Sequence, residues 1–181
     1  MQNENLLTKI SNWDVQAARH ILSRTLFGIT QQEVDFALTK TLDEFVDDYL
    51  LADISEPPAP GDWVNELPIP QNGKVDRQRF MELTYWWFDL MKNQGYSLAE
   101  KMVLLWHNHF VSEISVVKFP QYLYKQNKLF REFAFGNIKE LTKAVTIDPA
   151  MLIYLDGRKN SKRKSNENYG RELLELFTMG V

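Results

Sequence analysis

The stretch TYWWFDLMKNQGYSLAEKMVLLWHNHF, residues Thr84 to Phe110, decides the fold because it predicts two helices joined by a tight turn. Apolar residues cover most of the first helix, so we expect it to run from about Asp76 to Asn93 in a central, buried position. Gly95 is suited to end it. Ser97 and Glu100 then form a capping box that opens the second helix, which carries LLWHNHF.

Helical signals continue on both sides of this stretch. A helix from about Asp14 to Phe27 is expected to end with Gly28 in a left-handed conformation. Other helix starts are marked by capping residues or by proline in a first turn: Thr30 with Glu33, Thr41 with Glu44, Pro120, Asn137, and Asp148 with Pro149. No segment alternates polar and apolar residues over a strand's length. The sequence therefore predicts an all-α fold, a multi-helix orthogonal bundle of about seven to nine helices, with residues 1–181 as a single helical domain.

Residues 52–75 interrupt the helical pattern. Five of the seven prolines lie here, and proline is excluded from helix interiors. The segment also carries Trp63, Val64, Leu67 and Ile69, which are too apolar for a free linker. We therefore expect a proline-rich loop that packs on the helices rather than a domain boundary.

Composition excludes several classes of protein. The 181 residues carry a net charge of −3, which does not favour nucleic-acid binding. Absence of cysteine excludes disulfides and thiolate chemistry in this chain. No apolar run is long enough to span a membrane, and no signal peptide is visible, so the sequence predicts a cytoplasmic location.

His107-Asn108-His109 is the most conspicuous candidate for chemistry. Two residues apart on a helix point about 200° apart, whereas helical metal sites use histidines three or four apart. One interpretation is a buried histidine hydrogen-bonded to a structural partner, with the other at the rim. The alternative is a catalytic site or a divalent-metal site, which requires a frayed or extended backbone at this point.

Arg19, His20 and Arg24 lie on a rather apolar first helix. A buried arginine must be paired, so Arg24 predicts a carboxylate partner in the core. The candidates are the acidic residues of the C-terminal third, Asp148, Asp156, Glu167 and Glu172. A structural ion pair is the favoured interpretation.

The last helix, about Asn166 to Met179, concentrates polar groups at its start. Asn166 and Asn168 are suited to cap it or to hold an anion, and Glu172 pairs with Asn168. Arg171 lies one turn from Glu167. The basic loop before it, residues 158–164, is predicted to be solvated and mobile, with an anion-binding role as the alternative.

Four segments resemble one bacterial family in the same order, AARHILSRTLFG, LLWHNHF, DPAMLIYLDG and NENYGRELLELFTMGV. The chain resembles the N-terminal part of the family called domain of unknown function 1800. It departs from the family pattern at Ser165, where proline is usual, and at Gly170, where alanine is usual. The resemblance implies that the domain continues beyond Val181. It also implies a possible partner, because members are often encoded beside sulfatase-like proteins.

Two functional hypotheses remain open at this point. The first is a helical binding or scaffold protein with a buried polar network of Arg19, His20, Arg24, Asp148, Asp156, Asn166, Asn168 and Glu172. The second is a metal-assisted or general acid–base hydrolase-like enzyme, with His107, His109, Glu167 and Arg171 as catalytic residues and His107, His109 and Glu167 as metal ligands. The missing C-terminal part would complete that site.

Overall fold

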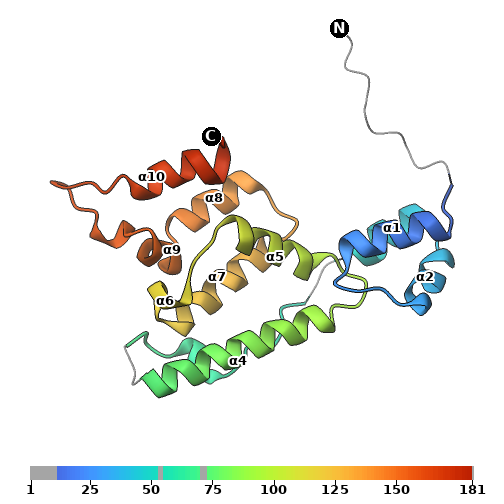
Figure 1. Cartoon of the computed structure of the whole chain (residues 1–181), viewed down its shortest axis with the longest axis horizontal. Helices are drawn as coiled ribbons and strands as arrows, with labels where there is room; N and C mark the ends of the chain where they lie inside the picture. The colour runs from blue at the N-terminus through green and yellow to red at the C-terminus, as the bar shows by residue number, and fades with distance from the viewer. Residues whose placement is uncertain (1–11, 53–54, 70–72, 181) are drawn as a thin grey trace, which may run out of the picture. The chain divides into compact units, whose positions relative to one another are not determined.

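A computed structural model describes residues 12–52, 55–69 and 73–180 (Figure 1). Within these ranges the chain forms ten α-helices and four short 3-10 or π segments, and no strand. The all-α prediction is therefore confirmed. None of the helices in these ranges combines the length and the apolar character that crossing a membrane requires.

The described chain divides into two compact units, of which the first comprises the residues up to 52 together with 94–98. It contains α1 (Val15–Thr25), α2 (Gln31–Leu38) and α3 (Leu42–Phe45), which continues as the π segment η1 (Val46–Leu50). Ala18, Leu22 and Phe45 are fully buried in its core. The indole Nε1 of Trp13 donates to the backbone oxygens of Ala37 (3.2 Å) and Lys40 (3.1 Å) and so ties the chain before α1 to the end of α2.

Local capping explains where these helices start. The capping boxes of Thr30 with Glu33 and of Thr41 with Glu44 are both formed, as predicted. The predicted end of α1 is wrong. The helix stops at Thr25 because Leu26 is already extended, and Gly28 does not take a positive φ.

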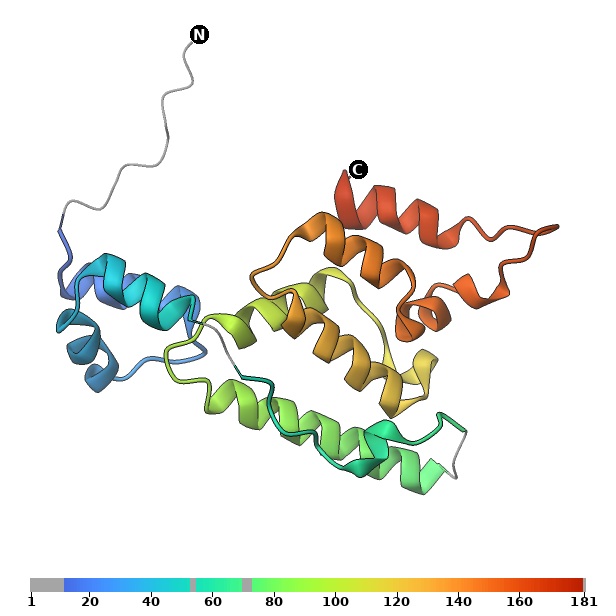
Figure 2. The same ribbon diagram turned by 180° about the vertical axis from the view of Figure 1, so that it is seen from behind.

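The second unit comprises residues 55–93 and the chain from residue 99 onward. Its elements, several of which Figure 2 shows from behind, are η2 (Asp62–Asn65), α4 (Gly73–Lys92), α5 (Ala99–His109), α6 (Ile114–Val117), α7 (Pro120–Glu132), α8 (Ile138–Thr146), α9 (Pro149–Tyr154), η3 (Gly157–Lys159), α10 (Asn168–Glu172) and η4 (Leu173–Thr178). Asn137 caps α8 as predicted. Gly95, which was predicted to end the helix before it, follows α4 within residues 94–98 of the first unit and has a positive φ of 63°.

Helix α7 is the centre of the second unit because it contacts α4, α5, α6, α8, α9 and η2. Its apolar side, represented by Phe130, joins a core that also contains Val103, Phe110, Leu141 and Met151. Helices from distant parts of the sequence are thus organised around one amphipathic segment.

The predicted burial of α4 is wrong. None of its residues is fully buried, and Tyr85 and Phe88 are 66% and 65% exposed. Only one side of the YWWF sequence, with Trp86 and Trp87, packs against the unit. Because the helix lies at the surface of the unit, its apolar circumference leaves a wide exposed stripe.

From residue 55 onward, the described part of the proline-rich segment lies in the second unit. Trp63 and Val64 are buried there beside Tyr124 of α7. The Nε1 of Trp63 donates to Glu82 of α4 at 2.8 Å. These contacts place Trp63 and Val64 against helices. Leu67 and Ile69, which were expected to pack as well, are 74% and 57% exposed.

Candidate functional site

His107 and His109 lie at the C-terminal end of α5, which stays helical through His109. The two rings enter different surroundings, as helical geometry requires for residues two apart. His107 stands edge-on to Trp87, with ring centroids 4.9 Å apart, and also faces Phe130. His109 stands edge-on to Phe110, with centroids 4.7 Å apart. Aromatic rings therefore surround each histidine.

The polar atoms of the two histidines fit structural roles. Burial lowers the pKa of His107 below its ordinary value of 6.5, because the charged ring is poorly solvated there. His109 Nε2 lies 2.8 Å from the backbone oxygen of Phe177 in η4. A carbonyl can only accept, so Nε2 carries the proton and donates. This bond joins the end of α5 to the C-terminal helix.

Glu167 and Arg171, the other predicted catalytic residues, lie at the start of the C-terminal helix. Both are exposed. Arg171 donates to Asn168 Oδ1 at 2.8 Å and lies 3.4 Å from Glu172 Oε1. Within the described ranges, no hydrogen bond or ion pair joins Glu167 or Arg171 to His107 or His109. No group of three His, Asp or Glu residues that could hold a metal ion is found in those ranges.

Asp148 is buried at the start of α9. Its Oδ2 accepts from the backbone N–H of Met151 and from Nε2 of Gln126, both at 2.9 Å. Gln126 of α7 accepts in turn from the hydroxyl of Ser112. Burial raises the pKa of Asp148 from 3.8 to about 6, and these two hydrogen bonds offset part of the effect. The predicted helix-capping role is confirmed, and the residue also anchors a buried polar chain between α7 and α9.

Asn166 and Asn168 hold the base of the segment between α9 and α10. Asn166 Nδ2 donates to the backbone oxygen of Asp156 at 3.2 Å, and its N–H donates to Asn160 Oδ1 at 2.6 Å. Asn168 donates its N–H to Asn166 Oδ1 at 2.9 Å and its Nδ2 to the oxygen of Leu155 at 3.4 Å. Both asparagines thus stabilise the backbone of the segment between α9 and α10.

The predicted core pairing of the first helix is wrong. Arg19, His20 and Arg24 are all exposed on α1. Arg19 donates to Gln31 Oε1 at 2.6 Å. Because Arg24 remains in contact with water, its charge needs no buried carboxylate.

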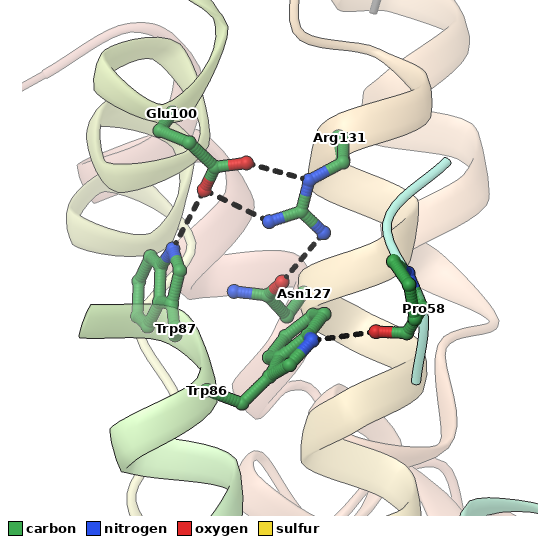
Figure 3. A network of polar contacts seen from close by, with 6 residues as sticks. All are labelled: Pro58, Trp86, Trp87, Glu100, Asn127 and Arg131. Carbon is green, nitrogen blue, oxygen red and sulfur yellow. Dashed lines mark hydrogen bonds and ion pairs between the residues drawn. The ribbon is translucent and has the colours of Figure 1, made fainter. Parts of the chain in front are cut away.

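The buried polar centre of the second unit is a pair that the sequence did not reveal, Glu100 of α5 and Arg131 of α7 (Figure 3). Their side chains are only 8% and 7% exposed. Arg131 Nε donates to Glu100 Oε1 at 2.8 Å, and Nη2 donates to Oε2 at 2.9 Å. This two-bond geometry is the strongest form of an arginine–carboxylate contact.

Neighbouring side chains complete this network. Trp87 Nε1 donates to Glu100 Oε2 at 3.0 Å, and Arg131 Nη1 donates to Asn127 Oδ1 at 2.9 Å. The guanidinium carbon of Arg131 lies 5.2 Å from the ring centroid of Trp86. Trp86 Nε1 donates to the backbone oxygen of Pro58 at 2.7 Å. We call Trp86, Trp87, Glu100, Asn127 and Arg131 the Glu100–Arg131 network.

The polar atoms of Glu100 and Arg131 are hydrogen-bonded to other side chains of the protein. Both carboxylate oxygens of Glu100 and all three nitrogens of Arg131 have protein partners. These bonds, made between buried side chains of different helices, hold the helices in register. The network fixes α4, α5, α7 and the proline-rich segment to one another.

The signals for this network were ambiguous in the sequence. Glu100 stands three residues after Ser97, which suggested a capping box, yet α5 begins at Ala99 and both Glu100 oxygens face other side chains. The sequence offered no signal that Arg131 of α7 would meet Glu100, which lies 31 residues away in the chain.

Comparisons with known proteins give one match. The chain matches the family described as "Protein of unknown function (DUF1800)" over residues 20–181. No curated protein and no solved structure matches it. The match covers nearly the whole chain and confirms the resemblance drawn from its four motifs. This chain belongs to the DUF1800 family.

Proposed function

We propose that this chain is a non-catalytic helical binding or scaffold module. Its buried polar residues hold helices in register, and its binding surface is the apolar side of α4. The observation that carries the proposal is the exposed stripe of Met81, Tyr85 and Phe88, which are 46%, 66% and 65% exposed.

The spacing of these residues indicates one continuous apolar surface rather than three isolated exposed side chains. Positions four and three apart lie on one side of a helix, so the three side chains form one line along α4. Beside it is a groove of about 550 Å³ lined by Phe80, Met81 and Tyr85, with Ile114 of α6 on the other side. Large exposed apolar patches of this kind mark interaction sites.

The occupant that we propose is an amphipathic helix from the family domain's own continuation beyond Val181. The family resemblance predicts further helical sequence there, and laying an apolar helix face into an apolar groove is a common mode of recognition. The charged residues around the groove are Asp76, Arg77 and Lys118, which leave a net charge of only +1, so apolar contact would supply most of the affinity.

The residues suggested for catalysis give less support to the enzyme alternative. His109 donates its Nε2 proton to the backbone oxygen of Phe177, and in the described ranges no hydrogen bond or ion pair joins either histidine to Glu167 or Arg171. Elemental analysis separates the two hypotheses. Bound divalent metal that is lost in a His107→Ala, His109→Ala double variant would contradict a non-catalytic module.

Hydroxyl-radical footprinting tests the binding surface. The natural full-length protein is compared with residues 1–181, and labelling is read at Met81, Tyr85 and Phe88. We expect several-fold lower labelling of all three in the longer protein. Phe135, also exposed, is the internal reference because it lies outside the stripe. Equal labelling of the stripe in both proteins would overturn the proposed occupant.

A further inference from the structure

The segment between α9 and α10 projects away from the helices of its unit in both views (Figures 1 and 2). Residues 157–166, which we call the basic arm, read GRKNSKRKSN and contain five basic residues and no acidic one. The sequence suggested a mobile, solvated loop. The structure gives this segment a definite backbone arrangement.

Hydrogen bonds close the arm at its tip and at its base. At the tip, Ser161 N–H donates to the oxygen of Lys164 at 2.9 Å, and Lys164 N–H donates back at 3.1 Å. At the base, Asn166 N–H donates to Asn160 Oδ1 at 2.6 Å, and Asn166 Nδ2 donates to the oxygen of Asp156 at 3.2 Å. The chain therefore folds back on itself and presents residues 162 and 163 at the tip.

The basic side chains of the arm are exposed, and most have no carboxylate near them. Lys159 pairs with Asp156 at 2.7 Å. In the ranges that the structure describes, none of the others has an ion-pair partner; they are Arg158, Lys162, Arg163 and Lys164. None of these four side chains is used to hold the arm together, so their charges are available to a ligand.

The charge of the arm contrasts with the rest of the chain. The whole chain carries −3 and the arm carries +5, so the remaining residues carry −3 − 5 = −8. A long polyanion that contacts the arm would also approach this negative remainder and be repelled. A short acidic ligand avoids that repulsion because it need not reach beyond the arm.

We propose that the basic arm binds an acidic segment of a partner protein, a short run of Asp and Glu side chains. Carboxylates accept two parallel hydrogen bonds from arginine, and Arg158 and Arg163 supply two such groups beside lysines. The hydrogen bonds at the tip and base of the arm hold the basic residues in one short turn, and a surface held in its binding arrangement has a lower entropy cost of binding. This surface is separate from the α4 stripe, and the inference does not rest on the proposed function.

Fluorescence anisotropy with a labelled Glu- and Asp-rich decapeptide tests the inference on the full protein. We expect binding that weakens as salt is raised. Lys162→Gln, Arg163→Gln, Lys164→Gln should weaken it at least about tenfold, a loss of about 1.4 kcal/mol that three exposed ion pairs can supply. The matched control neutralises three exposed lysines elsewhere in the same unit, Lys125→Gln, Lys139→Gln, Lys143→Gln.

The outcomes separate the arm from general electrostatics. Loss of affinity in the arm variant with little change in the control supports the inference. Equal losses in both variants, or no binding of the peptide, would overturn it. A single-stranded oligonucleotide and vesicles of anionic lipid serve as competing probes. Tighter binding of either one than of the peptide would also overturn the assignment of an acidic protein segment.

Discussion

Replacing Asp148 with Asn tests the buried carboxyl at the start of α9. Asparagine caps a helix about as well as aspartate, so the variant keeps an acceptor for Met151 N–H and Gln126 Nε2 while removing the ionisable group. What changes is the dependence of stability on pH.

The magnitude follows from the raised pKa. The folded protein holds the Asp148 proton up to about pH 6, whereas the ordinary value is 3.8. At about 1.4 kcal/mol per pH unit, this difference corresponds to about 3 kcal/mol. The sign follows from the upward shift of the Asp148 pKa. The stability that the bound proton contributes is fully present below about pH 3.8 and is lost as pH rises through about 6. Asp148→Asn should therefore gain about 3 kcal/mol in free energy of unfolding, relative to the unaltered protein, between pH 4 and 7.5.

Urea unfolding of both proteins across that range measures the effect, and NMR titration of the Asp148 carboxyl measures the pKa directly. Asp14→Asn is the control because Asp14 caps α1 from an exposed position. A stability difference that does not change with pH, or a titration midpoint below 4, would refute the reasoning. So would a change of the opposite sign, which a carboxylate stabilised in its charged form would produce.

Two further substitutions test the packing of the second unit by denaturant unfolding. Glu100→Gln should lower the free energy of unfolding by about 3–5 kcal/mol, because it leaves the buried Arg131 guanidinium uncompensated. The pair Glu100→Leu, Arg131→Met should cost less, and an equal or larger loss would contradict this explanation. Gly170→Ala should raise stability by about 0.5–1 kcal/mol, because a Cβ there meets nothing within 4 Å. A loss of stability would show that the position needs glycine.

Features set by neighbours in the sequence were predictable. The capping boxes at Thr30 and Thr41 and the start of α9 at Asp148 each depend on hydrogen bonds within three residues. The left-handed conformation of Gly95 depends on the residue itself. Such features are decided before tertiary packing and so are visible in a single sequence.

Features set by tertiary position were not predictable. The exposure of Tyr85 and Phe88 depends on which helices cover α4. The spacing of apolar residues in the sequence does not predict which helices those are. Arg24 sits on a helix as apolar as many buried ones, yet faces water. Glu100 and Arg131 meet across 31 residues of chain, and with one sequence nothing links the two positions. The candidate site is harder still, because the two histidines are local but their partners come from distant helices.

The Glu100–Arg131 pair also has a consequence for the rate at which the native state is lost. The two charged side chains are removed from water only when α5 and α7 are already packed. We therefore expect their contact to form after the folding transition state. Interactions absent from the transition state slow unfolding and leave the folding rate nearly unchanged. The pair would then act on the lifetime of the folded unit, which sets its resistance to irreversible inactivation.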